Sequence, residues 1–154
     1  MAYNTITELL QNIEERVLVS LVNDETRDVE DVNLASGTDV ATVRIVNAIT
    51  EADAEIDGYL RARYSLPLSS TPTLVKQLSR DICIYNLYKR RMRESIPESI
   101  IEIYNICVKV LEKIQRGEIH LGVEVAGESS PGAGVTVNKT ADDRVFPKEM
   151  WDSY

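Results

Sequence analysis

Asp53 and Asp57 are the two carboxyl residues whose spacing best fits acid–base chemistry. They lie four positions apart in a stretch with helical periodicity, so their side chains would share one helix face. Two neighbouring carboxyl groups can divide the acid and base roles of a reaction between them. A solvated and mildly repulsive helix face is the commoner meaning of such a pair, and we favour it here. An uncharacterised enzyme that uses this pair is the competing hypothesis.

One histidine and two cysteines are the remaining candidates for nucleophilic catalysis. His120 falls in a segment with strand-like alternation, where we expect it to face solvent. Cys83 and Cys107 fall in predicted helices, where reduced, buried and small apolar side chains are expected. A disulfide would require the two helices to pack with these positions facing each other. Because no nucleophile can be matched to a base, we predict no catalytic residues and no enzymatic activity.

Two loop patterns imitate ligand-binding motifs but lack the residues on which those motifs depend. Residues 24–35 begin like a calcium loop, yet Val29 stands where glycine is needed and Ala35 where a bidentate glutamate is needed. Gly127 and Gly132 have the spacing of a phosphate-binding loop, but they are not followed by the required lysine and hydroxyl residue. We therefore predict no metal and no cofactor.

Lys89, Arg90, Arg91 and Arg93 form the dense basic cluster of the chain. The cluster ends a predicted helix, where the helix dipole favours cations, and this alone can explain it. It could instead contact an acidic partner, or the acidic N-terminal segment of a neighbouring copy. Phosphate contact is disfavoured, because the net charge is −8 and residues 1–31 hold eight acidic residues against two arginines.

Apolar periodicity predicts helices as far as Gly117, which is expected to end the last of them. A capping box at residues 5–8 precedes a first short helix, and a second short helix is expected over residues 17–22. Three longer helices are expected to start near residues 39, 73 and 96. A second capping box, at residues 95–98, is expected to begin the last helix.

The chain changes character after the last helix. Apolar residues alternate over residues 119–125, which predicts a β-strand. Residues 127–134 are rich in glycine and serine and are expected to form a flexible linker. The tail beyond them holds the only phenylalanine and the only tryptophan, so we expect it to dock on this fold or on a neighbour. Its candidate interface residues are Arg144, Phe146, Met150, Trp151 and Tyr154.

These patterns predict a mainly α fold, a helical bundle of about four to five helices with a short C-terminal β-strand or hairpin arm and an extended tail. The expected parts are a helical body (1–117), a β-strand arm (118–126) and a flexible linker with the aromatic docking tail (127–154). With 154 residues and 44% apolar content, the chain can bury a core. Its short apolar runs do not suit a membrane span, and residues 1–4 do not resemble a signal peptide, so we expect cytoplasmic synthesis.

Several landmarks taken together resemble one family. They are Tyr3 and residues 52–60 (ADAEIDGYL), 63–68 (RYSLPL), 81–87 (DICIYNL), 117–121 (GEIHL) and 144–146 (RVF). With these landmarks the chain resembles the neck proteins of Mu-like phages and prophages, formerly catalogued as a domain of unknown function. The resemblance covers nearly the whole chain. Residues 56–68 are its most specific part, and the acidic residues 23–38 are its least characteristic part.

The resemblance implies a structural role without catalytic residues. Such proteins are similar to head–tail connectors, or adaptors, which form a ring beneath the portal of tailed phages, join capsid to tail and line the DNA channel. It implies a homo-oligomeric, dodecameric ring that contacts the portal protein and a tail terminator or another neck protein. It also implies passing genomic DNA without specific binding, and no membrane. The implied location is the virion neck, assembled in the host bacterial cytoplasm.

A small DNA-binding regulatory or packaging-associated protein is the alternative function. It would use the basic cluster at the end of the helix predicted to start near residue 73, and its affinity for DNA would fall steeply with salt.

Overall fold

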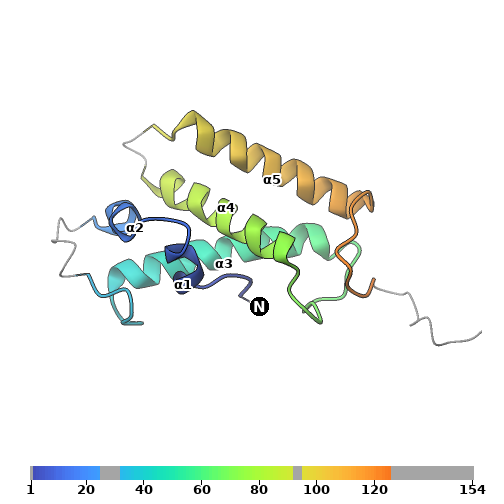
Figure 1. The fold of residues 1–154 in the computed structure, drawn as a ribbon, viewed down its shortest axis with the longest axis horizontal. Coiled ribbons are helices and arrows are strands. Elements are labelled where there is room, and N and C mark those ends of the chain that lie inside the picture. The colour runs from blue at the N-terminus through green and yellow to red at the C-terminus, as the bar shows by residue number, and fades with distance from the viewer. Residues whose placement is uncertain (1, 25–31, 92–94, 126–154) are drawn as a thin grey trace, which may run out of the picture.

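Three long helices form the body of the protein in the computed structural model, which describes residues 2–24, 32–91 and 95–125. They are α3 (Val40–Leu60), α4 (Thr73–Arg90) and α5 (Glu98–Arg116), and each contacts the other two. Figure 1 shows α3 and α5 running in the same direction, with α4 antiparallel to both. The expected mainly helical bundle is confirmed.

Two short helices, α1 (Ile6–Leu10) and α2 (Glu15–Val22), complete the described fold, and α2 packs against α3 and α4. The capping box at the start of α1 is confirmed: the backbone N–H of Glu8 donates to Oγ1 of Thr5 at 3.3 Å, and the backbone N–H of Thr5 donates to Oε2 of Glu8 at 3.0 Å. These two contacts satisfy backbone donors that a helix start otherwise leaves without partners.

The long helices begin where the sequence predicts, but the start of α5 differs in detail. Asp39 caps α3 by accepting a hydrogen bond from the backbone N–H of Ala41 at 2.9 Å. The predicted capping box of Ser95 with Glu98 is wrong, because α5 begins only at Glu98 with Pro97 as its N-cap residue. The proline ring disfavours helical geometry at Ile96, which would have been the first residue of a helix capped by Ser95.

The core is built from one apolar stripe of α3 and from the facing sides of α4 and α5. Every member of that stripe is buried: Ile45, Ile49, Ala52, Ile56 and Leu60. Cys83 of α4 and Cys107 of α5 are free and buried, as expected. Burial raises the pKa of the Cys83 thiol to about 12 and that of Cys107 to about 11, so both are small apolar core residues at neutral pH.

The segment after α5 departs from the predicted β-strand. Gly117 ends α5 in the left-handed conformation, with φ of 82°, as expected for a C-cap glycine. Over residues 118–125 the structure has a single isolated bridge, between Tyr64 and Val125, in place of a strand. Gly122 also has a positive φ, 73°, and bends the chain there. The apolar side chains of this segment are partly buried against the core: Ile119, Leu121, Val123 and Val125.

None of the helices in the described part of the chain is long and apolar enough to cross a membrane. The predicted linker and aromatic tail, residues 127–154, lie outside the described residues.

Candidate functional site

Asp53 and Asp57 hold the N-terminal segment against α3. Asp53 is only 6% exposed, and it accepts hydrogen bonds from the backbone N–H of Tyr3 at 2.9 Å and from Oγ of Ser79 at 2.6 Å. The hydroxyl of Tyr3 donates to Oδ1 of Asp57. The expected solvated helix face is therefore wrong for Asp53, because the N-terminal segment and α4 cover it. Burial raises the pKa of the Asp53 carboxyl, while the hydrogen bonds from Ser79 and Tyr3 oppose that rise.

The same two carboxyl groups line a small hollow of about 330 Å³ together with Ala2, Thr50 and Ala54. The hydroxyl of Thr50 donates to the carbonyl oxygen of Val46 at 2.8 Å. The polar side chains of this hollow thus have partners within the chain, and the geometry assigns the two carboxylates to holding the N-terminus.

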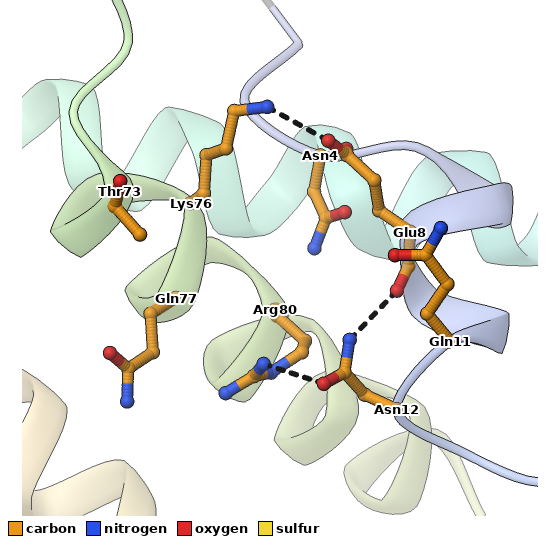
Figure 2. A pocket seen from close by; sticks show the side chains of 8 residues that line it. All are labelled: Asn4, Glu8, Gln11, Asn12, Thr73, Lys76, Gln77 and Arg80. Carbon is orange, nitrogen blue, oxygen red and sulfur yellow. Dashed lines mark hydrogen bonds and ion pairs between the residues drawn. The ribbon is translucent and has the colours of Figure 1, made fainter.

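A polar groove of about 480 Å³ lies between α1 and α4 (Figure 2). Its lining residues are Asn4, Glu8, Gln11, Asn12, Thr73, Lys76, Gln77 and Arg80. Nζ of Lys76 lies 2.8 Å from Oε1 of Glu8, and Nη1 of Arg80 donates to Oδ1 of Asn12 at 3.0 Å. The Lys76 ammonium holds the pKa of the Glu8 carboxyl below its usual range. These contacts fasten α1 to α4, and an ionised, paired Glu8 is not poised as a general acid or base near neutral pH.

The basic cluster is used in part by the fold itself. Arg90 binds Asp24 with both ends of its guanidinium, Nη1 to Oδ2 at 2.6 Å and Nη2 to Oδ1 at 2.8 Å. Its Nη2 also donates to the carbonyl oxygen of Leu21 at 2.8 Å, at the C-terminal end of α2. Hydrogen bonds from Arg90 hold the pKa of the Asp24 carboxyl below its usual range. Contact of the basic cluster with the acidic N-terminal segment of a neighbouring copy was one of the alternatives that the sequence left open; Arg90 instead binds the acidic Asp24 of its own chain.

A second arginine joins the same junction. Nη1 of Arg44 donates to the carbonyl oxygen of Val22 at 2.7 Å, and its Nη2 lies 3.4 Å from Oδ2 of Asp24. Two cations, one from α3 and one from α4, therefore meet the last carbonyls of α2, where the helix dipole is negative.

The other predicted interface residues divide into two groups. Lys89 is exposed at the end of α4, and Arg91 is half-buried, with its charge near Asp24. Arg93 and the tail residues Arg144, Phe146, Met150, Trp151 and Tyr154 lie outside the described residues.

The turn after α3, at Arg63 and Tyr64, contacts the segment that follows α5. Tyr64 is 2% exposed, and its hydroxyl oxygen accepts a hydrogen bond from the backbone N–H of Leu121 at 3.1 Å. Nη2 of Arg63 lies 3.3 Å from Nδ1 of His120, which is exposed as predicted. A Cβ atom at Gly117 would meet the end of the flexible Arg63 side chain, which can move aside, so it is the positive φ of 82° that favours glycine there. The sequence alone did not predict this contact between the turn and the segment after α5.

Comparison with known proteins identifies the family of the chain. Residues 3–139 match the family described as Bacteriophage Mu, Gp36. The chain belongs to this family. It is 36% identical to Gene product J of Escherichia phage Mu over 104 residues, which cover 67% of this chain and 70% of that protein. It is also 31% identical over 80 residues to the Mu-like prophage FluMu protein gp36 of Haemophilus influenzae, where the match covers 52% of this chain and 54% of the relative.

Membership of the Mu Gp36 family confirms the resemblance to proteins of Mu-like phages and prophages, and it indicates a phage structural or morphogenesis protein. The match to residues 3–139 includes the Tyr3 anchor on Asp53 and the Arg63–Tyr64 turn with the segment it holds.

Exposed apolar side chains are the surface feature that sequence reasoning overlooked in this Gp36-family chain. Those that are large and exposed are Val17, Val40, Val43, Val46, Ile101, Ile103 and Ile106. Six of the seven lie on α3 and α5, outside the faces of these helices that pack into the core. The amphipathic pattern could have revealed them, because both helices carry more apolar residues than one buried stripe needs.

Proposed function

We propose that this Gp36-family chain is a structural subunit of the phage neck, one copy in a head–tail connector ring that joins the portal to the tail and lines the DNA channel. The family match over residues 3–139 carries this proposal, because it ties the helical body and the start of the tail to Mu-like phages. The proposed partners are further copies of the chain, the portal protein and a tail terminator or another neck protein.

The geometry supports a structural role over a catalytic one. The candidate acid–base pair holds the N-terminal segment, and the groove between α1 and α4 is lined by groups that bind each other. Within residues 2–24, 32–91 and 95–125, no group of three or more His, Cys, Asp and Glu side chains is placed to hold a metal ion. These polar side chains thus hold parts of the same chain together, as expected for a structural subunit.

Charge supports a channel wall rather than a DNA-binding surface. The net charge of −8 repels phosphate, so DNA would slide past such a wall without sticking. Arg90, the central cation of the basic cluster, is bound to Asp24, which weakens the alternative of a DNA-binding regulator. A shift of duplex DNA at low salt that disappears steeply as salt rises would favour that alternative.

Reconstitution tests the proposal directly. The full-length chain is mixed with portal rings from the same phage genome, and the products are examined by electron microscopy. We expect a second ring stacked on one end of the portal, and we expect the chain in purified virions at the neck. A chain that binds neither portal, capsid nor any tail component, and is absent from virions, would overturn the proposal.

A further inference from the structure

The outer face of α3 carries an uncharged strip that no described part of the chain covers. Val40, Val43 and Val46 are 49%, 42% and 46% exposed, although each is apolar. Thr50 and Ala54, also exposed, continue the same face at helical spacing. We call these five residues the α3 strip. A row of exposed and uncharged side chains, four of them β-branched, is typical of a protein contact rather than of a solvated face.

The outer face of α5 carries a second strip. Ile103 and Ile106 are 41% and 59% exposed, and half-buried Val110 follows them at helical spacing. We call these three residues the α5 strip. Ile101 is also exposed, at 39%, but lies on the other side of the buried face of α5. It therefore provides a matched position outside the strip.

The two strips belong to different helices that run in the same direction (Figure 1). A closed ring requires a heterologous contact, in which one face of each copy meets a different face of the next. When copies repeat side by side around a ring, α3 of one copy and α5 of its neighbour lie nearly parallel. Two separate strips on parallel helices satisfy both conditions.

The charges at the ends of the strips are complementary. Two acidic residues follow the valines toward the C-terminal end of α3: Glu51, which is exposed, and Asp57, which is half-buried. Beyond its isoleucines, the α5 strip leads toward Lys109 and Lys113, both exposed. In a parallel arrangement the valines of one copy face the isoleucines of the next, and the acidic residues then lie opposite the lysines. An antiparallel arrangement would lose this match, so charge favours the parallel one.

We infer that the α3 strip of one copy packs lengthwise against the α5 strip of the next copy, and that this contact joins neighbours in the ring. The inference rests on the proposed function, which supplies the ring. It adds the two surfaces that make the ring close.

Complementing variants test whether the contact is heterologous. Val46→Asp spoils the α3 strip and leaves the α5 strip intact, whereas Ile106→Asp does the reverse. Each variant alone should assemble at least about tenfold more weakly than the unaltered chain, because the contact would bury an unpaired charge. An equimolar mixture of the two should yield a dimer of twice the 17.3 kDa chain mass, because one good contact remains between them. Native mass spectrometry measures these species, and circular dichroism checks that each variant keeps its helices.

The matched control is Ile101→Asp, which places the same charge on the same helix outside the strip. It should assemble like the unaltered chain. Equal loss of assembly in this control, or a mixture of the two strip variants that stays monomeric while the unaltered chain assembles, would overturn the inference.

Cross-linking separates failure of the contact from failure of the proposed function. A chain with both Val46→Cys and Ile106→Cys is assembled on portal rings and treated with a short bismaleimide; Cys83 and Cys107 are buried, so they contribute little background. We expect a ladder of covalent oligomers, and only single chains from either cysteine variant alone. An assembled ring without a ladder overturns the contact and leaves the proposed function standing. An unaltered chain that assembles neither alone nor on portal rings overturns the proposed function and the inference with it.

Discussion

The hydroxyl oxygen of Tyr64 accepts a hydrogen bond from the backbone N–H of Leu121 at 3.1 Å, across 57 positions of the chain. Tyr64 lies in residues 56–68, the part of the sequence that most specifically resembles proteins of Mu-like phages, and Leu121 lies in the segment after α5. The turn therefore holds the last segment that the structure describes, residues 118–125, against the helical body.

Replacing Tyr64 by phenylalanine should loosen this segment without emptying the core. The ring stays buried, but the Leu121 N–H loses its acceptor, at a cost of about 0.5–1.5 kcal/mol. Hydrogen exchange at the Leu121 amide should accelerate by about threefold to tenfold, while exchange in α3 and α4 changes little.

The control for this change is Tyr59→Phe. It removes the same atom from a half-buried tyrosine whose hydroxyl has no hydrogen-bond partner among the residues that the structure describes. Equal acceleration in both variants would show that the Tyr64 hydroxyl does not hold the segment.

A second prediction concerns the buried carboxylate of Asp53. Asp53→Ala leaves the Tyr3 N–H and the Ser79 hydroxyl without their acceptor, so the free energy of unfolding should fall by about 1–3 kcal/mol. Asp53→Asn should cost less, because its amide oxygen can still accept from Tyr3 and the Ser79 hydroxyl can rotate to accept from its NH₂ group. Urea unfolding followed by circular dichroism measures both values.

A double-mutant cycle with Ser79→Ala isolates the Asp53–Ser79 contact. The coupling should be favourable, since the two groups are buried and 2.6 Å apart. Additive effects, or an exposed-site variant such as Glu51→Gln that costs as much as Asp53→Ala, would contradict the role of Asp53 as the anchor of the N-terminus.

Asp53 and the apolar stripe of α3 show which buried residues could be predicted from the sequence and which could not. The burial of Ile45 through Leu60 follows from local periodicity, because residues on one helix face share one environment. The burial of Asp53 depends on Tyr3, which lies 50 positions away, and no local pattern encodes that meeting. The contact of Arg90 with Asp24, 66 positions apart, was out of reach for the same reason.

The β-strand predicted after α5 was wrong for a different reason. Its alternation of apolar residues is real, and it predicts a strand because a strand exposes every second side chain. In the structure these four apolar side chains are partly buried, as one face of a strand would be, but Gly122 has a positive φ and the segment forms one isolated bridge in place of a strand. Glycine in an alternating run was the available warning.

The last prediction concerns the pH dependence of the junction between α2, α3 and α4. Arg90 holds the pKa of Asp24 below its ordinary value of 3.8, so the folded chain favours the carboxylate more than the unfolded chain does. The stability that this pair contributes is therefore present above pH 3.8 and is lost as the pH falls through the lower folded pKa. The variant Asp24→Asn lacks this contribution at every pH. The difference in unfolding free energy between the unaltered chain and this variant should thus be largest near neutral pH and shrink in acid.

An exposed ion pair provides the comparison for that measurement. Arg116 and Glu112 lie one turn apart on α5 at 3.4 Å, with side chains 65% and 45% exposed. Neutralising this pair by Glu112→Gln should change stability by only about 0–0.5 kcal/mol, because water screens it and the side chains lose freedom in forming it. Replacing Asp24 by asparagine should lower the free energy of unfolding by more, because Arg90 binds Asp24 with two nitrogens and also caps α2. A difference for Asp24→Asn that stays constant from neutral pH into acid would show that the pair does not stabilise the junction through its charge.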